Sequence, residues 1–151
     1  MHNRIIPVTT SFIQTICAAV LLFLAAPIAH SDSHEPRTDA EPVMAETGAD
    51  GIQRLEITLD SYSFAPAYIV VQAGKPVELR LRNVTTITPH NFRLESIADG
   101  LDLDKDVAPG KAETLSFSAA KPGMYEFYCD EKLLFFPSHK EKGMIGKLEV
   151  R

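Results

Sequence analysis

The sequence from Gly51 onward predicts an all-β domain, either a sandwich or a barrel. Apolar side chains there recur with a period of two residues rather than 3.6, which is typical of strands that bury one face. Turns containing glycine and proline, such as residues 73–76 and 120–123, separate the apolar runs at short intervals. This spacing is usual in sandwiches and barrels, and no stretch has the pattern of an amphipathic helix.

The individual strands are recognised by their alternation. The clearest one covers residues 77–81, where Val77, Leu79 and Leu81 face inward between polar neighbours. The same alternation predicts strands at residues 55–59, 92–95, 114–118 and 125–129. A short apolar run predicts another strand at residues 68–71, and residues 145–150 are expected to form the last strand. Four aspartates are expected to form a solvated acidic loop, because their spacing lacks the order of an EF-hand; these are Asp99, Asp102, Asp104 and Asp106.

The N-terminus has the features of a secretory signal peptide. Arg4 precedes an apolar run from Ile16 to Ala29, which is shorter than the roughly 18–20 residues of a spanning helix. Small residues and a cleavage-like tripeptide then end the run. We expect a signal peptide at residues 1–31, a disordered linker at 32–50 and one folded domain at 51–151. The predicted location is the periplasm, without stable membrane insertion after cleavage; a retained anchor is the alternative.

Charge and cysteine content narrow the function further. The chain has 15 basic and 20 acidic residues, and removing residues 1–31 takes away only Arg4, which leaves 14 − 20 = −6. Because nothing basic dominates this chain, nucleic-acid binding is not expected. The shortened chain would keep a single cysteine, Cys129. In an oxidising compartment such a residue is a metal ligand, a free thiol or an intermolecular linker.

Metal-ligand residue types gather around this cysteine. Cys129 continues the apolar face of the strand at 125–129, so its thiol is expected in the interior. His139 and Met144 follow in the next loop, and His90 lies at the start of another predicted strand. One thiol, two imidazoles and a weak axial thioether are the ligand set of a mononuclear blue copper site. Methionine suits zinc poorly, and a nucleophilic thiol or a merely space-filling cysteine are the other interpretations.

From Phe64 to Val150 the chain resembles the cupredoxins, the family of plastocyanin, azurin and small periplasmic copper-binding domains. The matching segments include residues 64–66, 71–77, 89–92, 121–129 and 143–146, together with Asn83 and His139. The resemblance implies a Greek-key β-sandwich and one Cu(I)/Cu(II) ion that transfers electrons, so that the protein is a carrier and not an enzyme. The ligands implied are His90, Cys129, His139 and, as the axial group, Met144. Asn91 is implied to hydrogen-bond across the site and steady the cysteine loop.

The loop after the cysteine departs from the family pattern. Familiar members place the second histidine two to four residues beyond the cysteine, whereas this chain has C-x9-H-x4-M. His139 keeps its assignment because no other histidine lies downstream, but Glu131 or Glu95 competes with Met144 as the expected axial ligand. A dinuclear copper centre is excluded, because it needs a second cysteine in this loop.

The resemblance also bears on partners. A monomer with a redox partner protein is expected, and some similar periplasmic cupredoxins are associated with ferrous-iron uptake, where copper takes an electron from Fe(II). The partner would then be a membrane iron-uptake or respiratory component. The apolar residues 133–136 and nearby lysines mark a docking end for an acidic partner, or else a packed loop with solvated lysines. Copper delivery without a redox partner, or a metal-free interaction module, are the alternative functions.

Overall fold

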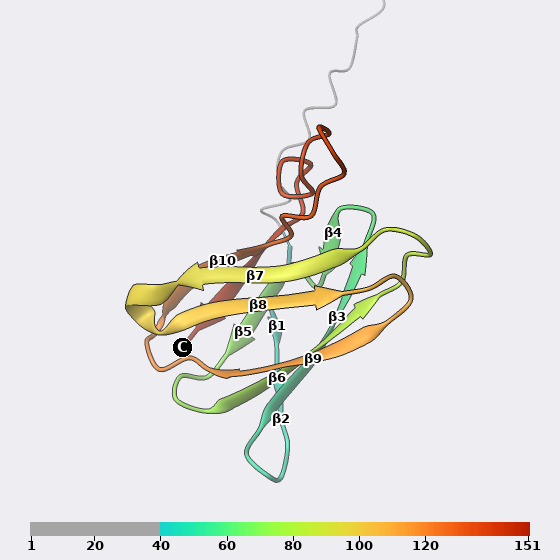
Figure 1. Cartoon of the computed structure of the whole chain (residues 1–151). Coiled ribbons are helices and arrows are strands. Elements are labelled where there is room, and N and C mark those ends of the chain that lie inside the picture. The colour runs from blue at the N-terminus through green and yellow to red at the C-terminus, as the bar shows by residue number, and fades with distance from the viewer. Residues whose placement is uncertain (1–39) are drawn as a thin grey trace, which may run out of the picture. The chain divides into compact units, whose positions relative to one another are not determined.

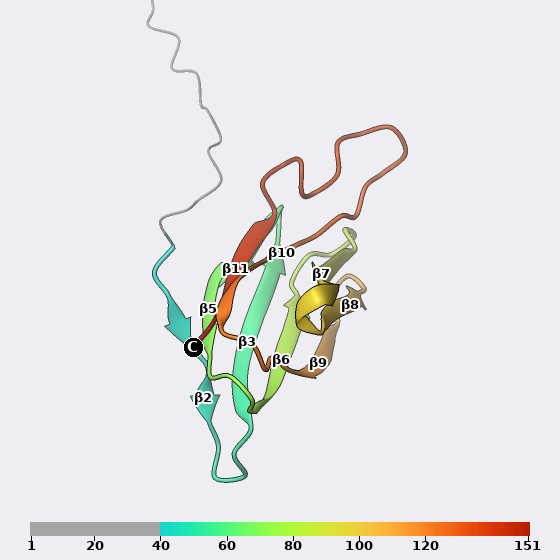
Figure 2. The same cartoon turned by 90° about the vertical axis from the view of Figure 1, so that its left-hand side faces the viewer.

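The computed structural model describes residues 40–151, which form two packed β-sheets (Figures 1 and 2). The first sheet has the order β1 (Val43–Met44), β5 (Tyr68–Val71), β11 (Ile145–Val150), β10 (Gly123–Tyr128), β7 (His90–Ser96) and β8 (Leu101–Val107). The second has the order β2 (Glu46–Thr47), β3 (Gln53–Asp60), β6 (Pro76–Asn83) and β9 (Ala112–Ser118), with β4 (Ser63–Ala65) also paired to β3. The predicted all-β, Greek-key sandwich is confirmed. Within residues 40–151, no helix is long and apolar enough to cross a membrane.

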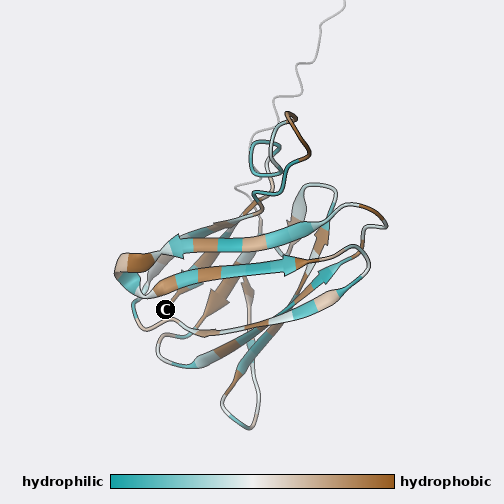
Figure 3. Cartoon of the chain, in the orientation of Figure 1, coloured by the Kyte–Doolittle hydropathy of each residue, from teal (hydrophilic) through white to brown (hydrophobic). Residues whose placement is uncertain are grey.

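The core lies between the sheets and is built from the alternating residues. Ile57 and Leu59 from β3 and Leu148 from β11 are fully buried and belong to one hydrophobic cluster with side chains of both sheets. Phe92 and Phe127 stack with ring centroids 4.6 Å apart. Figure 3 shows the same alternation as brown and teal bands along the strands. Burial of each large apolar side chain contributes roughly 1.5–3 kcal/mol to the stability of the fold. The core therefore stabilises the strands that carry the site at the end of the sandwich.

The prediction of a solvated acidic loop is wrong, because three of the four aspartates lie in strand β8. Leu101, Leu103 and Val107 are buried, while Asp102 and Asp104 point to solvent between them. The strand pairs antiparallel with β7. Aspartate is a poor strand former, but Leu101, Leu103, Asp102 and Asp104 do alternate with the period of two that is typical of a strand.

The predicted linker is also wrong in its second half, because residues 43–47 form two short strands. β1 runs parallel to β5 in the first sheet, and β2 pairs antiparallel with β3 in the second. The connecting Ala45 donates its backbone N–H to Val70 O over 2.9 Å. This segment is held by backbone pairing and has no apolar periodicity, so its order could not be predicted from the side chains. The predicted signal peptide and the first part of the linker lie outside the described residues.

The pairing of three strands places their ligand-bearing ends together. β10 is antiparallel to both β7 and β11. The end of β10 therefore lies beside the beginnings of β7 and β11, at one end of the sandwich. The loop that joins β10 to β11 extends from this end, as both views of the fold show (Figures 1 and 2).

Candidate metal centre

Three metal-binding side chains meet at this end of the sandwich. His90 is the first residue of β7, Cys129 directly follows β10, and His139 lies in the β10–β11 loop. The Nδ1 atoms of the two imidazoles are 3.1 Å apart, and Cys129 Sγ lies 3.8 Å from His90 Nδ1 and 3.4 Å from His139 Nδ1. All three side chains are buried. The structure thus brings together three of the four residues predicted to bind the metal.

The spacing of the donor atoms suits one metal ion. Bonds of about 2.0 Å to nitrogen and about 2.3 Å to sulfur, the lengths found in zinc sites, separate the donors of a trigonal set by about 3.5–3.7 Å. The observed separations of 3.1–3.8 Å bracket these values. His90 Nε2 is buried and has no hydrogen-bond partner within residues 40–151. Nothing therefore holds the imidazole through its far nitrogen, and its Nδ1 is directed at the other donors.

Met144 lies beside this cluster and is fully buried, immediately before β11. Its carbonyl accepts the backbone N–H of Cys129 over 3.1 Å, and its N–H donates to His139 O over 2.9 Å. No carboxylate of residues 40–151 joins the three donors in the metal-binding group. Glu95 is exposed and Glu131 is half-buried. This arrangement favours the buried thioether of Met144 over either carboxylate as a fourth, axial group.

Burial controls the protonation of all three donors. It raises the pKa of the Cys129 thiol to about 11, although the backbone N–H groups of Asn91 and Glu131 pull the pKa back toward its ordinary value. Burial lowers the pKa of His90 to about 4, and the neighbouring His139 adds to this effect. The pKa of His139 is lowered by burial and then by Lys142. At neutral pH the metal-free site therefore holds a protonated thiol and two neutral imidazoles, which are ready to bind a metal.

A family profile described as a cupredoxin-like domain matches residues 15–145. The chain belongs to the cupredoxin family. Together with the buried cysteine and histidines, this membership supports a site for a single copper ion. No curated protein sequence matches the chain significantly.

Solved structures of similar fold include several copper proteins. One is the metal binding domain of the Cu(I)-exporting P-type ATPase CopA of Streptococcus pneumoniae, with 21% identity, a TM-score of 0.56, and coverage of 74% of this chain and 97% of that one. Reduced auracyanin from Roseiflexus castenholzii has 25% identity and a TM-score of 0.53, covering 71% and 98%. Auracyanin A, a "blue" copper protein from Chloroflexus aurantiacus, has 22% identity and a TM-score of 0.52, covering 67% and 100%. These likenesses support the cupredoxin fold.

Asn91 joins β7, the strand that begins with His90, to Asp130, the residue after Cys129. Its side chain donates to Asp130 Oδ1 over 2.7 Å and accepts the backbone N–H of Asp130 over 3.0 Å. Its own backbone N–H donates to Cys129 Sγ over 3.3 Å. Arg93 adds an ion pair to Asp130 at 2.9 Å. The bracing role implied for Asn91 by the family resemblance agrees with these contacts, and they hold the sulfur at a set distance from β7.

Asn83 performs a similar task for the loop that precedes His90, a role that the sequence did not indicate. Its buried side chain donates to Thr88 O and Val107 O, each over 2.9 Å, and accepts the N–H of Thr85. One amide thus satisfies backbone groups on three segments and shapes the turn into β7. A polar residue that ends an otherwise well-alternating strand was the available signal.

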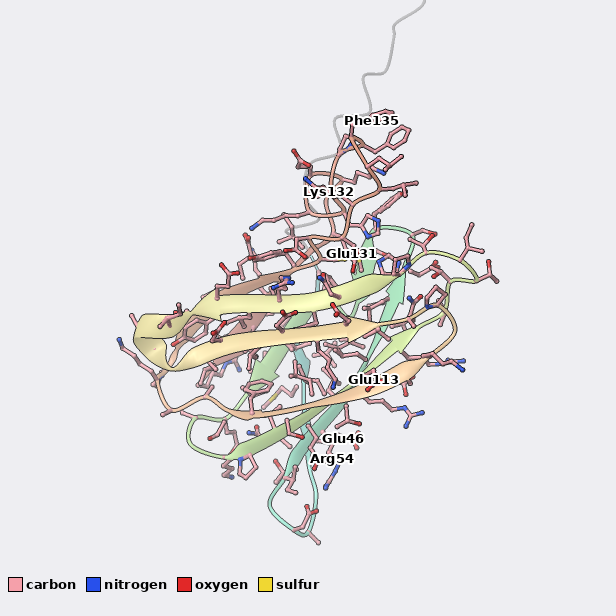
Figure 4. All side chains as sticks on the ribbon, viewed as in Figure 1. Glu46, Arg54, Glu113, Glu131, Lys132 and Phe135 are labelled. Carbon is pink, nitrogen blue, oxygen red and sulfur yellow. The ribbon has the colours of Figure 1, made fainter. Side chains whose placement is uncertain are left out.

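The long β10–β11 loop of this cupredoxin is anchored at its base and exposed at its tip. The backbone N–H of His139 donates to Glu131 O over 2.8 Å, which joins the two ends of the loop segment between these residues. The tip side chains are exposed by 68%, 74%, 86% and 51%; they are Leu133, Leu134, Phe135 and Phe136. Figure 4 shows Phe135 at the far end of the loop, with Lys132 and Glu131 nearer the sandwich, and Figure 3 shows the tip in brown. Of the two readings of this loop, the exposed apolar tip favours docking over packing.

Proposed function

We propose that this cupredoxin is an exported, periplasmic electron carrier whose copper is held by His90, Cys129, His139 and axially by Met144. The convergence of one thiol and two imidazole Nδ1 atoms in a buried pocket carries this proposal. When bound, copper supplies a one-electron Cu(II)/Cu(I) couple, which this mixture of soft and borderline ligands accommodates in both states. A single chain contributes every donor, which is consistent with a monomer.

The chain's own residues keep the donors in place during such a cycle. The Asn91–Asp130 contacts hold the cysteine loop to β7. Backbone hydrogen bonds join Cys129 to Met144 and Met144 to His139. Because these contacts do not involve the donor atoms, we expect them to be retained in both charge states of the site. A site that needs little rearrangement suits a carrier, since preorganised groups require little motion when charge changes.

The β10–β11 loop tip is the proposed docking surface for a redox partner with an acidic rim, such as a membrane iron-uptake or respiratory component. Four apolar side chains form the tip, and Lys132 at its base makes no ion pair within residues 40–151. Lys140 and Lys142 also flank the site, but the first pairs with Glu126 and the second contacts Tyr62. Charges of this kind mainly set the encounter rate. Lys132→Glu should slow electron transfer and reduce its salt dependence, whereas an unchanged rate would exclude the acidic partner.

Ferrous iron is the proposed electron source, on the strength of the family resemblance. The step would oxidise Fe(II) to Fe(III) and reduce Cu(II) to Cu(I), one electron for one electron. Mixing Fe(II) with the Cu(II)-loaded protein without oxygen should bleach its visible absorption. If the visible absorption persisted, Fe(II) would be excluded as the electron source, and the proposed role in iron uptake would fail while electron transfer from another donor would remain.

Optical and spin-resonance spectra of the Cu(II)-loaded protein test the main proposal. We expect intense thiolate-to-copper absorption that disappears on reduction and is absent from Cys129→Ser. Met124→Leu is a suitable control, because Met124 is 54% exposed. A colourless protein that binds Cu(I) without cycling would indicate copper delivery. A protein that binds no copper would indicate a metal-free interaction module.

A further inference from the structure

Tyr62 contacts the candidate metal centre from the opposite sheet. It lies in the turn between β3 and β4, whereas the donors come from β7 and the β10–β11 loop. Figure 1 shows this turn at the same end of the sandwich as the loop. The Tyr62 ring meets the His139 imidazole edge to face, with centroids 4.8 Å apart and planes at 69°. This is a favourable geometry for two aromatic rings.

Lys142 also contacts Tyr62. Its Nζ lies 4.3 Å from the Tyr62 ring centroid and donates to the Tyr62 hydroxyl over 3.1 Å. The backbone N–H of Lys142 donates to His139 O over 3.1 Å. Tyr62 is therefore joined both to the ring of His139 and to the turn that carries it.

The two-residue turn between β3 and β4 has positive φ at both positions, as tight hairpin turns require, yet neither residue is glycine or asparagine. Ser61 and Tyr62 have φ values of +33° and +69°, a region that favours glycine. Bulky residues are held there only when the surrounding structure demands it. The substitution Tyr62→Gly would relieve any backbone strain at this position but would remove the ring that covers His139.

The length of the ligand loop explains why such a cover is needed. Nine residues separate Cys129 from His139, so the cysteine alone constrains the imidazole weakly. A cleft of about 430 Å³ reaches His139, and Tyr62, Ile87, Phe136 and Lys142 are among its lining residues. Tyr62 is 38% exposed, whereas His139 beside it is 7% exposed. The tyrosine thus forms part of the wall between the imidazole and solvent.

We propose that Tyr62 is a positioning residue that fixes the imidazole of His139 and closes the metal centre to solvent from the opposite sheet. The inference about a loaded site rests on the proposed function, but the closure itself belongs to the chain with or without copper. It replaces the constraint that a shorter cysteine-to-histidine loop would provide. Tyr62 acts through His139 and does not itself bind the metal.

The first test uses the metal-free protein and the rate at which an aromatic disulfide reagent modifies Cys129. Because a buried thiol reacts only through local opening, Tyr62→Gly should react about tenfold faster than the wild type. Tyr62→Phe keeps the ring and should stay within about twofold. Ile87→Ala is the matched control, since it shortens another side chain of the same cleft. Thermal unfolding should show little loss in Tyr62→Gly, because relief of strain offsets the lost contacts.

The second test compares the Cu(II)-loaded variants by spin resonance and reduction potential. Tyr62→Gly should differ from the wild type in both, and Tyr62→Phe should restore both. A Tyr62→Gly variant with the thiol rate and spectra of the wild type would overturn the proposal. So would a fast thiol reaction that merely follows global unfolding, since Tyr62 would then be an ordinary packing residue. If the wild type binds no copper, the proposed function fails, while the thiol rates still decide whether Tyr62 closes the site.

Discussion

Asn91 and Asp130 form a reciprocal pair, in which the amide of Asn91 donates to the carboxylate of Asp130 and accepts its backbone N–H. The pair bridges β7 and the residue that follows Cys129, so it joins two ligand-bearing segments without using a ligand atom. The arrangement of the donor residues therefore depends on Asn91 and Asp130, which are not among the metal-binding side chains.

Asn91→Ala should destabilise the metal-free protein by about 1–3 kcal/mol, because it removes both hydrogen bonds and leaves the Asp130 N–H unpaired. Chemical denaturation measures this change. Thr114→Ala, at an exposed position on β9, should change the free energy of unfolding by less than about 0.5 kcal/mol. Equal stability of the two variants would contradict a bracing role for Asn91.

Gly146→Ala should destabilise the fold by about 2–3 kcal/mol through overpacking. A Cβ at this position on β11 would collide with the Phe127 ring and lie 2.8 Å from Ala67 O. Gly123→Ala is the control, because a Cβ there would approach no atom more closely than the Tyr125 ring at 3.2 Å. Denaturation midpoints would compare the two, and a larger loss in Gly123→Ala would refute this account of the core.

Met144→Leu should leave the metal-free fold almost intact, since a volume-conserving swap usually costs less than about 1.5 kcal/mol. In the copper-loaded protein it should raise the reduction potential, because losing an electron donor weakens Cu(II) binding more than Cu(I) binding. A rise on the order of 60 mV corresponds to a tenfold change for one electron. Voltammetry measures it, and a potential equal to that of Met124→Leu would exclude Met144 as the axial ligand.

Binding of Cu(I) near pH 7 should release about one proton, from Cys129. The thiol is protonated at this pH because its pKa is raised to about 11, and His90 is neutral because its pKa is lowered to about 4. Raising the pH removes the proton that competes with the metal, so the apparent affinity should increase about tenfold per pH unit between pH 7 and 9. Calorimetry in buffers of different ionisation enthalpy counts the protons. Release of two or more would show that an imidazole is protonated in the free site.

The strands and the donor residues could be predicted because both leave local marks in the sequence. Val77, Leu79 and Leu81 alternate cleanly, and a single cysteine followed by His139 and Met144 is a distinctive combination. β8 was missed because aspartates occupy its outward positions. Tyr62 and Asn83 were missed for another reason: their roles depend on contacts with segments far away in the chain, which no local pattern records.

Residues 43–47, which form β1 and β2, affect how the edges of both sheets are protected. β1 covers part of the outer edge of β5, and β2 covers part of the edge of β3. A protein trimmed at residue 51, where side-chain alternation begins, would present bare backbone on both sheets. Uncovered edges recruit strands from neighbouring chains, so such a protein would be prone to self-association while its metal centre remained whole. We therefore expect residues 43–47 to limit self-association by occupying these two strand edges.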